Sequence, residues 1–161
     1  MLTGLNKKFS LLWRGGRDGF DAAAFHRLCD GKANTVTFIK NTNGFIFGGF
    51  TSLPWSSSGG VYQADKSAFL FSLTTPSNTP LKLNVKPAHN AVYHHSSDGP
   101  TFGAGHDLYV SSLSDKNRNS YMNLSSFEFP NVKSGKEVGK FIVGGSDNFF
   151  KTVEIEVFQV L

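Results

Sequence analysis

Residues 99–110, GPTFGAGHDLYV, join a glycine-rich segment to a histidine and a carboxylate, which are groups able to bind a ligand or move a proton. A phosphate-binding loop needs a third glycine or a Gly-Lys-Ser/Thr sequence, followed by a helix whose first amides bind the anion. Gly103 and Gly105 are followed instead by His106, Asp107 and an alternating apolar segment that indicates a strand. The sequence therefore does not match a nucleotide-binding loop.

His106 and Asp107 also do not match the pair of a nucleophilic site, which needs a Ser or Cys beside a His that a carboxylate orients. Neighbouring side chains on an extended strand point to opposite faces, and the chain has no Gly-x-Ser-x-Gly motif. We therefore interpret the segment as a tight corner, in which Asp107 binds backbone amides of the turn and Phe102 is buried. A small-ligand or hydrolase pocket formed with Arg17 and Asp18 is the alternative.

A second glycine-rich segment, RGGRDGF (14–20), carries charges that suit a contact with a protein partner. Alternatively, its glycines allow positive φ and its Arg–Asp pairing gives local order, which makes it only a turn between a strand and a helix. Trp55, in SLPWSSSGG, is either an exposed anchor for a partner or a ring packed beneath a proline-containing loop. The candidate binding positions are Arg14, Arg17, Asp18, Trp55, Gly103, Gly105, His106 and Asp107.

Cys29 is the single cysteine, so no internal disulfide is expected and the chain suits a reducing compartment. It falls on the apolar side of a predicted helix, where a free thiol behaves as a small hydrophobic group. Arg27 and Lys32 lie nearby and favour a thiolate, which leaves a redox-sensing role for Cys29 open. The histidines lack the converging spacing of a zinc site, so we expect neither a metal nor another cofactor.

We expect most of these candidate residues to lie on or beside β-strands, because apolar and polar residues alternate in the segments expected to be ordered. The run NTVTFIKNTNGFIFGGFT predicts a hairpin around Asn43-Gly44, a strong turn signal. Asp21 is a suitable N-cap for a short helix that continues to Cys29 and ends at Gly31. Further strands are expected over 9–15, 68–74, 81–85, 107–113, 140–145 and 151–160.

These elements predict a mostly β fold with minor α content, arranged as a two-sheet antiparallel β-sandwich. The last strand alternates Val153, Ile155 and Val157 with polar residues, so we expect these three on its buried face. No internal repeat and no linker divides the sequence. We therefore expect one domain over residues 1–161, with its core over roughly residues 11–160.

The 161-residue chain has a net charge of +4, with lysines and arginines scattered along it. Nucleic-acid-binding domains usually gather such charge on one face, so nucleic acid is not an expected ligand. No segment approaches the ~18 apolar residues of a transmembrane helix, and no signal peptide is visible. We expect a cytoplasmic protein without membrane insertion.

Six stretches, in order, resemble the TLDc domain, the family typified by oxidation-resistance proteins, and they extend from about residue 11 to residue 160. The family usually has a helical segment before the first of them, where this chain has only about ten residues, so we expect that part of the domain to be shortened. The stretches are LLWRGGRDGFDAAAFHRLCDGKANTVTFIK, NGFIFGGFTSLPW, DKSAFLFSL, GPTFGAGHDLYV, NSYMNL and VEIEVFQV.

The resemblance implies a β-sandwich of two antiparallel sheets flanked by short helices, and a role in protection against oxidative stress. It also implies binding to the V-type proton ATPase, through that enzyme's peripheral subunits, and no enzymatic reaction. Three functions are therefore open: a non-catalytic domain that binds a protein partner, a direct antioxidant domain that uses Cys29, or, less favoured, a small-ligand binder or hydrolase at the Arg17/Asp18 and His106/Asp107 loops.

Overall fold

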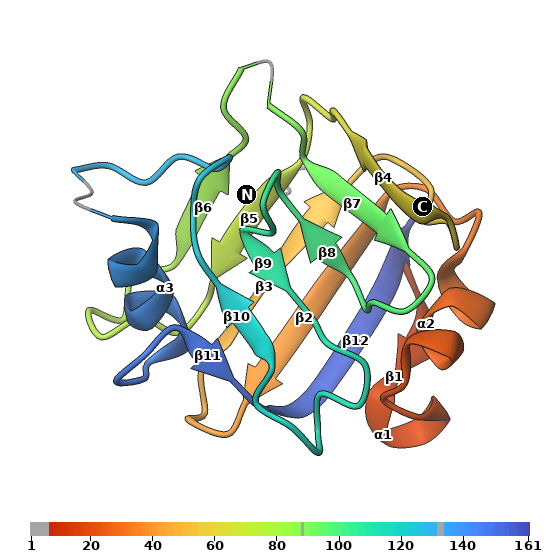
Figure 1. The fold of residues 1–161 in the computed structure, drawn as a ribbon, viewed down its shortest axis with the longest axis horizontal. Coiled ribbons are helices and arrows are strands. Elements are labelled where there is room, and N and C mark those ends of the chain that lie inside the picture. Colours follow the sequence, from red (N-terminus) through yellow and green to blue (C-terminus); the bar gives the residue numbers. More distant parts are fainter. Residues whose placement is uncertain (1–6, 88, 132–133) are drawn as a thin grey trace.

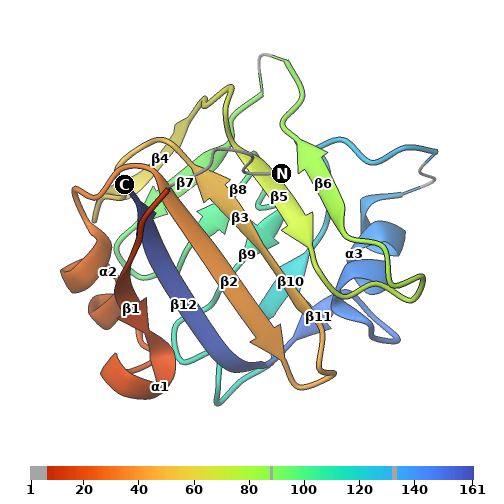
Figure 2. The ribbon, with the colours of Figure 1, turned by 180° about the vertical axis from the view of Figure 1, so that it is seen from behind.

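The computed structural model describes residues 7–87, 89–131 and 134–161, which form two antiparallel six-stranded sheets packed face to face (Figures 1 and 2). The chain has a mostly β fold with a few short helices, as the sequence predicts. The first sheet, nearer the viewer in Figure 2, has the order β1-β12-β2-β3-β5-β6. Its strands are β1 (Phe9–Arg14), β2 (Thr35–Asn41), β3 (Ile46–Thr51), β5 (Phe69–Ser72), β6 (Leu81–Asn84) and β12 (Thr152–Val160).

The second sheet, nearer the viewer in Figure 1, has the order β11-β10-β9-β8-β7-β4. Its strands are shorter, and β8, β9 and β11 have two residues each, so adjacent strands rather than local sequence define this sheet. The bounds are β4 (Gly59–Gln63), β7 (Val92–His95), β8 (Thr101–Phe102), β9 (Leu108–Tyr109), β10 (Ser120–Met122) and β11 (Phe149–Phe150).

Helices α1 (Gly15–Asp18), α2 (Ala22–Cys29) and α3 (Gly135–Val143) lie at the rims of the sandwich (Figure 1). The side chain of Asp21 accepts a hydrogen bond from the amide of Ala24 and caps α2, and Gly31 follows with a φ of 75°. Helices α1 and α2 pack beside β1 at one rim, and α3 packs against β10 and β11 at the other. The apolar sides of α2 and α3 thereby close the two open sides between the sheets.

One buried cluster lies between the sheets and includes side chains from α2 and α3. The first sheet contributes Ile39, Phe47 and Ile155 to it, among others, and each of these side chains is fully buried. Because the cluster also includes the ring of Phe102, the prediction that Phe102 is buried is confirmed. Other members are Phe25 and Cys29 of α2, Val138, Ile142 and Val143 of α3, and Leu108, Met122 and Phe150 of the second sheet.

The predicted strand over 140–145 is wrong, because these residues belong to α3 and to the turn after it. The side chain of Ser134 accepts a hydrogen bond from the amide of Glu137, and this Ser-x-x-Glu pattern is a signal for the start of a helix. Gly144, with a φ of 67°, ends the helix in the left-handed conformation. Between these signals, Val138 and Ile142 are one helical turn apart and both are buried.

Two other strand predictions are correct only in part. The strand expected over 107–113 is reduced to β9, because the chain turns after it and Leu113 has a φ of 56°. In β12, Ile155 and Val157 are buried as expected, but Val153 is 52% exposed. An irregularity between Thr152 and Glu154 shifts the alternation there, so Thr152 is buried and Val153 faces outward.

Substitution of Gly139 by alanine tests how closely α3 packs on β10. A Cβ at this position would overlap the carbonyl oxygen of Met122, a backbone atom that cannot easily move. Alanine gains about 1 kcal/mol in helix propensity, whereas overpacking costs about 1–3 kcal/mol, so we expect a lower free energy of unfolding in urea. Gly59→Ala is the matched control, because its Cβ would meet open space. Equal stability of the two variants would contradict this description of the helix contact.

Candidate functional site

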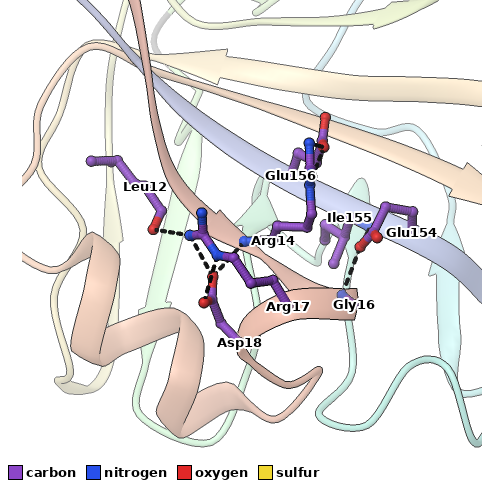
Figure 3. Close-up of polar contacts among 8 residues, drawn as sticks. All are labelled: Leu12, Arg14, Gly16, Arg17, Asp18, Glu154, Ile155 and Glu156. Atoms are coloured by element: carbon purple, nitrogen blue, oxygen red, sulfur yellow. Dashed lines mark hydrogen bonds and ion pairs between the residues drawn. The ribbon is translucent and has the colours of Figure 1, made fainter.

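The charged turn after β1 is an internally paired unit (Figure 3). The guanidinium of Arg17 donates two hydrogen bonds to the carboxylate of Asp18, both of 2.8 Å. The amide of Arg14 donates to the same carboxylate at 2.9 Å, and these bonds lower the pKa of Asp18. The predicted Arg–Asp pairing is therefore confirmed, and it orders the single turn of α1.

Two glutamates of strand β12 are the other partners of this charged turn. Glu156 pairs with Arg14, whose Nε lies 2.6 Å from the glutamate Oε1, and Glu154 accepts a hydrogen bond from the amide of Gly16 at 2.9 Å. Both arginines have an acidic partner, although their side chains remain 45% and 51% exposed. The turn therefore presents two partly neutralised guanidinium groups, which suits contact with another protein better than binding of a free anion.

Asp107 organises the glycine-rich segment that ends in His-Asp, and it is fully buried. Its Oδ2 accepts hydrogen bonds from the amides of Ser125, Ser126 and Phe127 at 2.7, 2.7 and 3.0 Å. The hydroxyl of Ser125 donates to Oδ1 at 3.0 Å. Burial raises the pKa of Asp107, and these hydrogen bonds act in the opposite direction. Asp107 does bind backbone amides, but they belong to residues 125–127 and not to its own turn, which corrects the sequence-based expectation.

His106 lies on the outer side of the same turn and is only partly buried. Its backbone is left-handed, with a φ of 65°, and Gly103 and Gly105 have φ values of 88° and 81°. A Cβ at Gly103 would collide with the Asp107 carboxylate, so glycine is required at that position. The two side chains of the His-Asp pair thus point to opposite sides, as predicted, and the carboxylate does not orient the imidazole.

The structure does not bring the two predicted loops together. Helix α1 packs against β1 and β12 at the edge of the first sheet, whereas the turn after β8 belongs to the middle of the second sheet (Figure 1). No hydrogen bond or ion pair among the described residues joins Arg17 or Asp18 to His106 or Asp107. This placement does not support the pocket that was the alternative interpretation.

Trp55 is 2% exposed, so its ring belongs to the core and not to the surface. The indole Nε1 donates a hydrogen bond to Thr35 Oγ1 at 2.8 Å, and the ring packs edge-on against Phe25 and Phe102. The interpretation of Trp55 as an exposed anchor is corrected by this burial. The Trp55 ring stabilises the packing of α2 against the two sheets.

Cys29 is fully buried in the main core cluster, and burial raises the pKa of its thiol. The negative charges of Asp30 and Asp18 act in the same direction. The basic neighbours in the sequence therefore do not produce a thiolate in the fold. Because the thiolate is the reactive form, the position of Cys29 does not favour redox chemistry in the folded chain.

An extended surface on the outer face of the second sheet was not predicted from the sequence. Its aromatic rings form a chain of contacts across the sheet, with centroids 4.5–5.8 Å apart. All four tyrosines of the chain take part. We call this surface the aromatic row, and it consists of Tyr62, Tyr93, His106, Tyr109, Tyr121 and Phe149.

The aromatic row lies on strands without charged side chains. The six strands beneath it contain no Asp, Glu, Lys or Arg. Burial lowers the pKa of His106, which favours the neutral imidazole, and burial together with Asp98 raises the pKa of Tyr109 to about 12. The Tyr109 hydroxyl donates to Asp98 Oδ1 at 3.3 Å, and no ion pair within the described residues includes Asp98.

Comparison with known proteins identifies the family of the chain. The TLDc domain matches residues 3–161. The chain belongs to the TLDc domain family. A segment of 53 residues is 42% identical to part of the Danio rerio MTOR-associated protein MEAK7, and it makes up 31% of this chain and 12% of that protein. Family membership supports a role in protein–protein interaction.

Two further observations concern metal-binding clusters and membrane-spanning helices. Within residues 7–87, 89–131 and 134–161, no group of three or more His, Cys, Asp or Glu side chains is placed to hold a metal ion. The helices formed by these residues are all too short or too polar to cross a membrane.

Substitution of Asp107 by asparagine tests whether this carboxylate holds the turn to residues 125–127. Asparagine keeps the shape but loses the charge and one acceptor oxygen, and hydrogen bonds to charged groups contribute about 1.5–3 kcal/mol each. We expect the free energy of unfolding in urea to fall by at least about 1.5 kcal/mol. Asp147→Asn, which weakens a surface ion pair with Arg118, is the control and should cost below about 1 kcal/mol. An unchanged stability for Asp107→Asn would refute the role assigned to it.

The burial of Cys29 gives a direct chemical prediction. Ellman's reagent should leave the thiol of the native domain unmodified and should react with one thiol per chain once the chain is unfolded in urea, because the buried thiol is protonated and shielded. Rapid reaction of the native domain, at a rate that does not depend on urea, would show that Cys29 is accessible.

Proposed function

We propose that this chain is a non-catalytic TLDc interaction domain that acts in protection against oxidative stress by binding the V-type proton ATPase. One observation carries the proposal: the groups with the most reactive chemistry are used by the fold itself. Asp107 is occupied by three amides, and Cys29 is enclosed in the core. The exposed arginine and aromatic side chains, in contrast, form surfaces that a partner can contact.

Membership of the TLDc domain family supports this assignment. The V-type ATPase is the partner implied by the resemblance of this chain to oxidation-resistance proteins, and contact with its peripheral subunits places the domain on the cytoplasmic side of a membrane that it does not enter. Two exposed surfaces are available for such a contact: Arg14 and Arg17 at the turn after β1, and the aromatic row.

The relative in Danio rerio favours a second candidate partner. That protein is named MTOR-associated, so an assembly containing MTOR is the alternative target of the domain. Both candidates describe the same biochemical activity, namely recognition of a protein surface, and they differ only in the partner.

Affinity purification with the tagged 161-residue chain tests the proposal. The bait is expressed in cells and isolated without crosslinking, and the bound proteins are identified by mass spectrometry against a tag-only control. We expect enrichment of subunits from the peripheral sector of the V-type ATPase. A folded bait is verified by its cooperative thermal unfolding.

Two results would overturn parts of the proposal. Consistent absence of ATPase subunits, with enrichment of an assembly containing MTOR, would overturn the ATPase as partner and support the alternative. Absence of any partner above the tag-only control, with a bait that unfolds cooperatively, would overturn the assignment as an interaction domain.

A further inference from the structure

We propose that the aromatic row is the binding surface for an arginine-bearing segment of a protein partner. The inference rests on the proposed function of the chain as a protein-binding domain, and it specifies the chemistry of the partner. The geometry of the row, its exposure and its electrostatics carry the argument.

The row crosses the second sheet from one edge to the other. Tyr121 is directly opposite both Phe149 and Tyr109, and Tyr62 is directly opposite Tyr93, so these rings share the outer face. Six strands at a spacing of about 4.8 Å give a surface about 24 Å long, which matches roughly seven residues of an extended peptide. A surface of this length suits a segment of chain better than a small molecule.

His106 makes the row continuous. The outward position on β8, opposite Tyr93, is occupied by Thr101. The side chain of Thr101 has no ring. The imidazole of His106 reaches this position from the turn, with its centroid 4.5 Å from that of Tyr93 and 5.6 Å from that of Tyr109. Its left-handed backbone costs of order 1 kcal/mol in a residue other than glycine, and such outliers cluster at functional positions.

Aromatic pairs on adjacent strands also stabilise sheets, so their presence alone does not indicate a ligand. The exposure of the rings is the observation that indicates a binding surface. Tyr62 and Phe149, at the two ends of the row, are 42% and 41% exposed. No helix of the described chain lies over this face in Figure 1, where the second sheet is in front. The two end rings are therefore accessible to a partner, and the other four rings of the row are partly exposed.

The electrostatics of the row favour a cation. The face of an aromatic ring carries negative partial charge, and the strands beneath contribute no Lys or Arg. Asp98 adds a carboxylate beside Tyr109 and has no ion-pair partner among the described residues. Arginine fits these groups better than lysine, because its planar guanidinium stacks on rings and donates in a plane to a carboxylate.

Fluorescence anisotropy with a defined probe tests the inference. The probe is a fluorescein-labelled peptide of alternating glycine and arginine, and the comparison peptide carries uncharged citrulline in place of arginine. At an ionic strength of about 0.15 M, where unspecific attraction is screened, we expect the arginine peptide to bind at least about fivefold more tightly.

Two substitutions separate the contributions of the ring and the carboxylate. Tyr121→Leu removes a π face but keeps apolar area, and Asp98→Asn removes the charge, so each should weaken binding of the arginine peptide by about three- to tenfold. Glu128→Gln is the matched control, because it removes one negative charge at an exposed position outside the row and should bind like the parent chain. Tyr62→Leu, at the exposed end of the row, replaces Tyr121→Leu if the latter does not unfold cooperatively.

Four outcomes would overturn the inference. Equal affinity for the arginine and citrulline peptides would exclude a cation site, and unchanged binding after the tyrosine substitution would exclude the row. Sedimentation that shows a dimer of the parent chain, lost in Tyr121→Leu, would assign the row to a second copy of this chain. If the peptide fails to bind while affinity purification still recovers a partner, this surface is wrong and the proposed function stands.

Discussion

The buried carboxylate of Asp107 determines the geometry of the turn that brings His106 to the middle of the aromatic row. Transfer of a carboxylate from water into a protein interior is costly unless hydrogen bonds replace its hydration. Three backbone amides and a hydroxyl from residues 125–127 replace it here. Because they approach from a segment about twenty positions later, the same interaction fixes the path of the chain between β10 and α3 and orients the turn between β8 and β9.

The consequence of this interaction is visible on the other side of the turn. With Asp107 directed inward, the preceding residue must point outward, and Gly103 and Gly105 allow the bend that places His106 over β8. The imidazole then joins the rings of Tyr93 and Tyr109, which would otherwise be separated by Thr101. A buried polar contact and an exposed aromatic surface therefore depend on each other, although they lie on opposite sides of the backbone.

The sequence predicted the first sheet far better than the second, for a physical reason. Strands such as β2 and β12 have seven and nine residues, so their alternation and the Asn43-Gly44 turn are local signals. Strands β8, β9 and β11 have two residues each and exist because neighbouring strands pair with them. Helix α3 was mistaken for a strand because its apolar run is short, although the capping pattern at Ser134 indicates a helix.

The site follows the same division between local and long-range information. The Arg17–Asp18 pair was predictable because its members are adjacent, and the burial of Phe102 followed from its pattern. The partners of Asp107 were not predictable, since residues 125–127 carry no signal that they will approach it. The aromatic row was missed for the same reason: its tyrosines are separated by 12–31 positions, and only the order of strands brings their rings into contact.

The two outer faces of the sandwich differ in a way that bears on how the TLDc domain can bind. On the first sheet the outward aromatic residues are phenylalanines, among them Phe38, Phe69 and Phe71, which pack against one another. On the second sheet they are mainly tyrosine and histidine, whose polar atoms can form hydrogen bonds as well as aromatic contacts. A surface of this kind is stable when free and loses little rotational freedom on binding, because its rings already constrain one another. The second sheet therefore offers a preformed surface, which suits the proposed recognition of a protein partner.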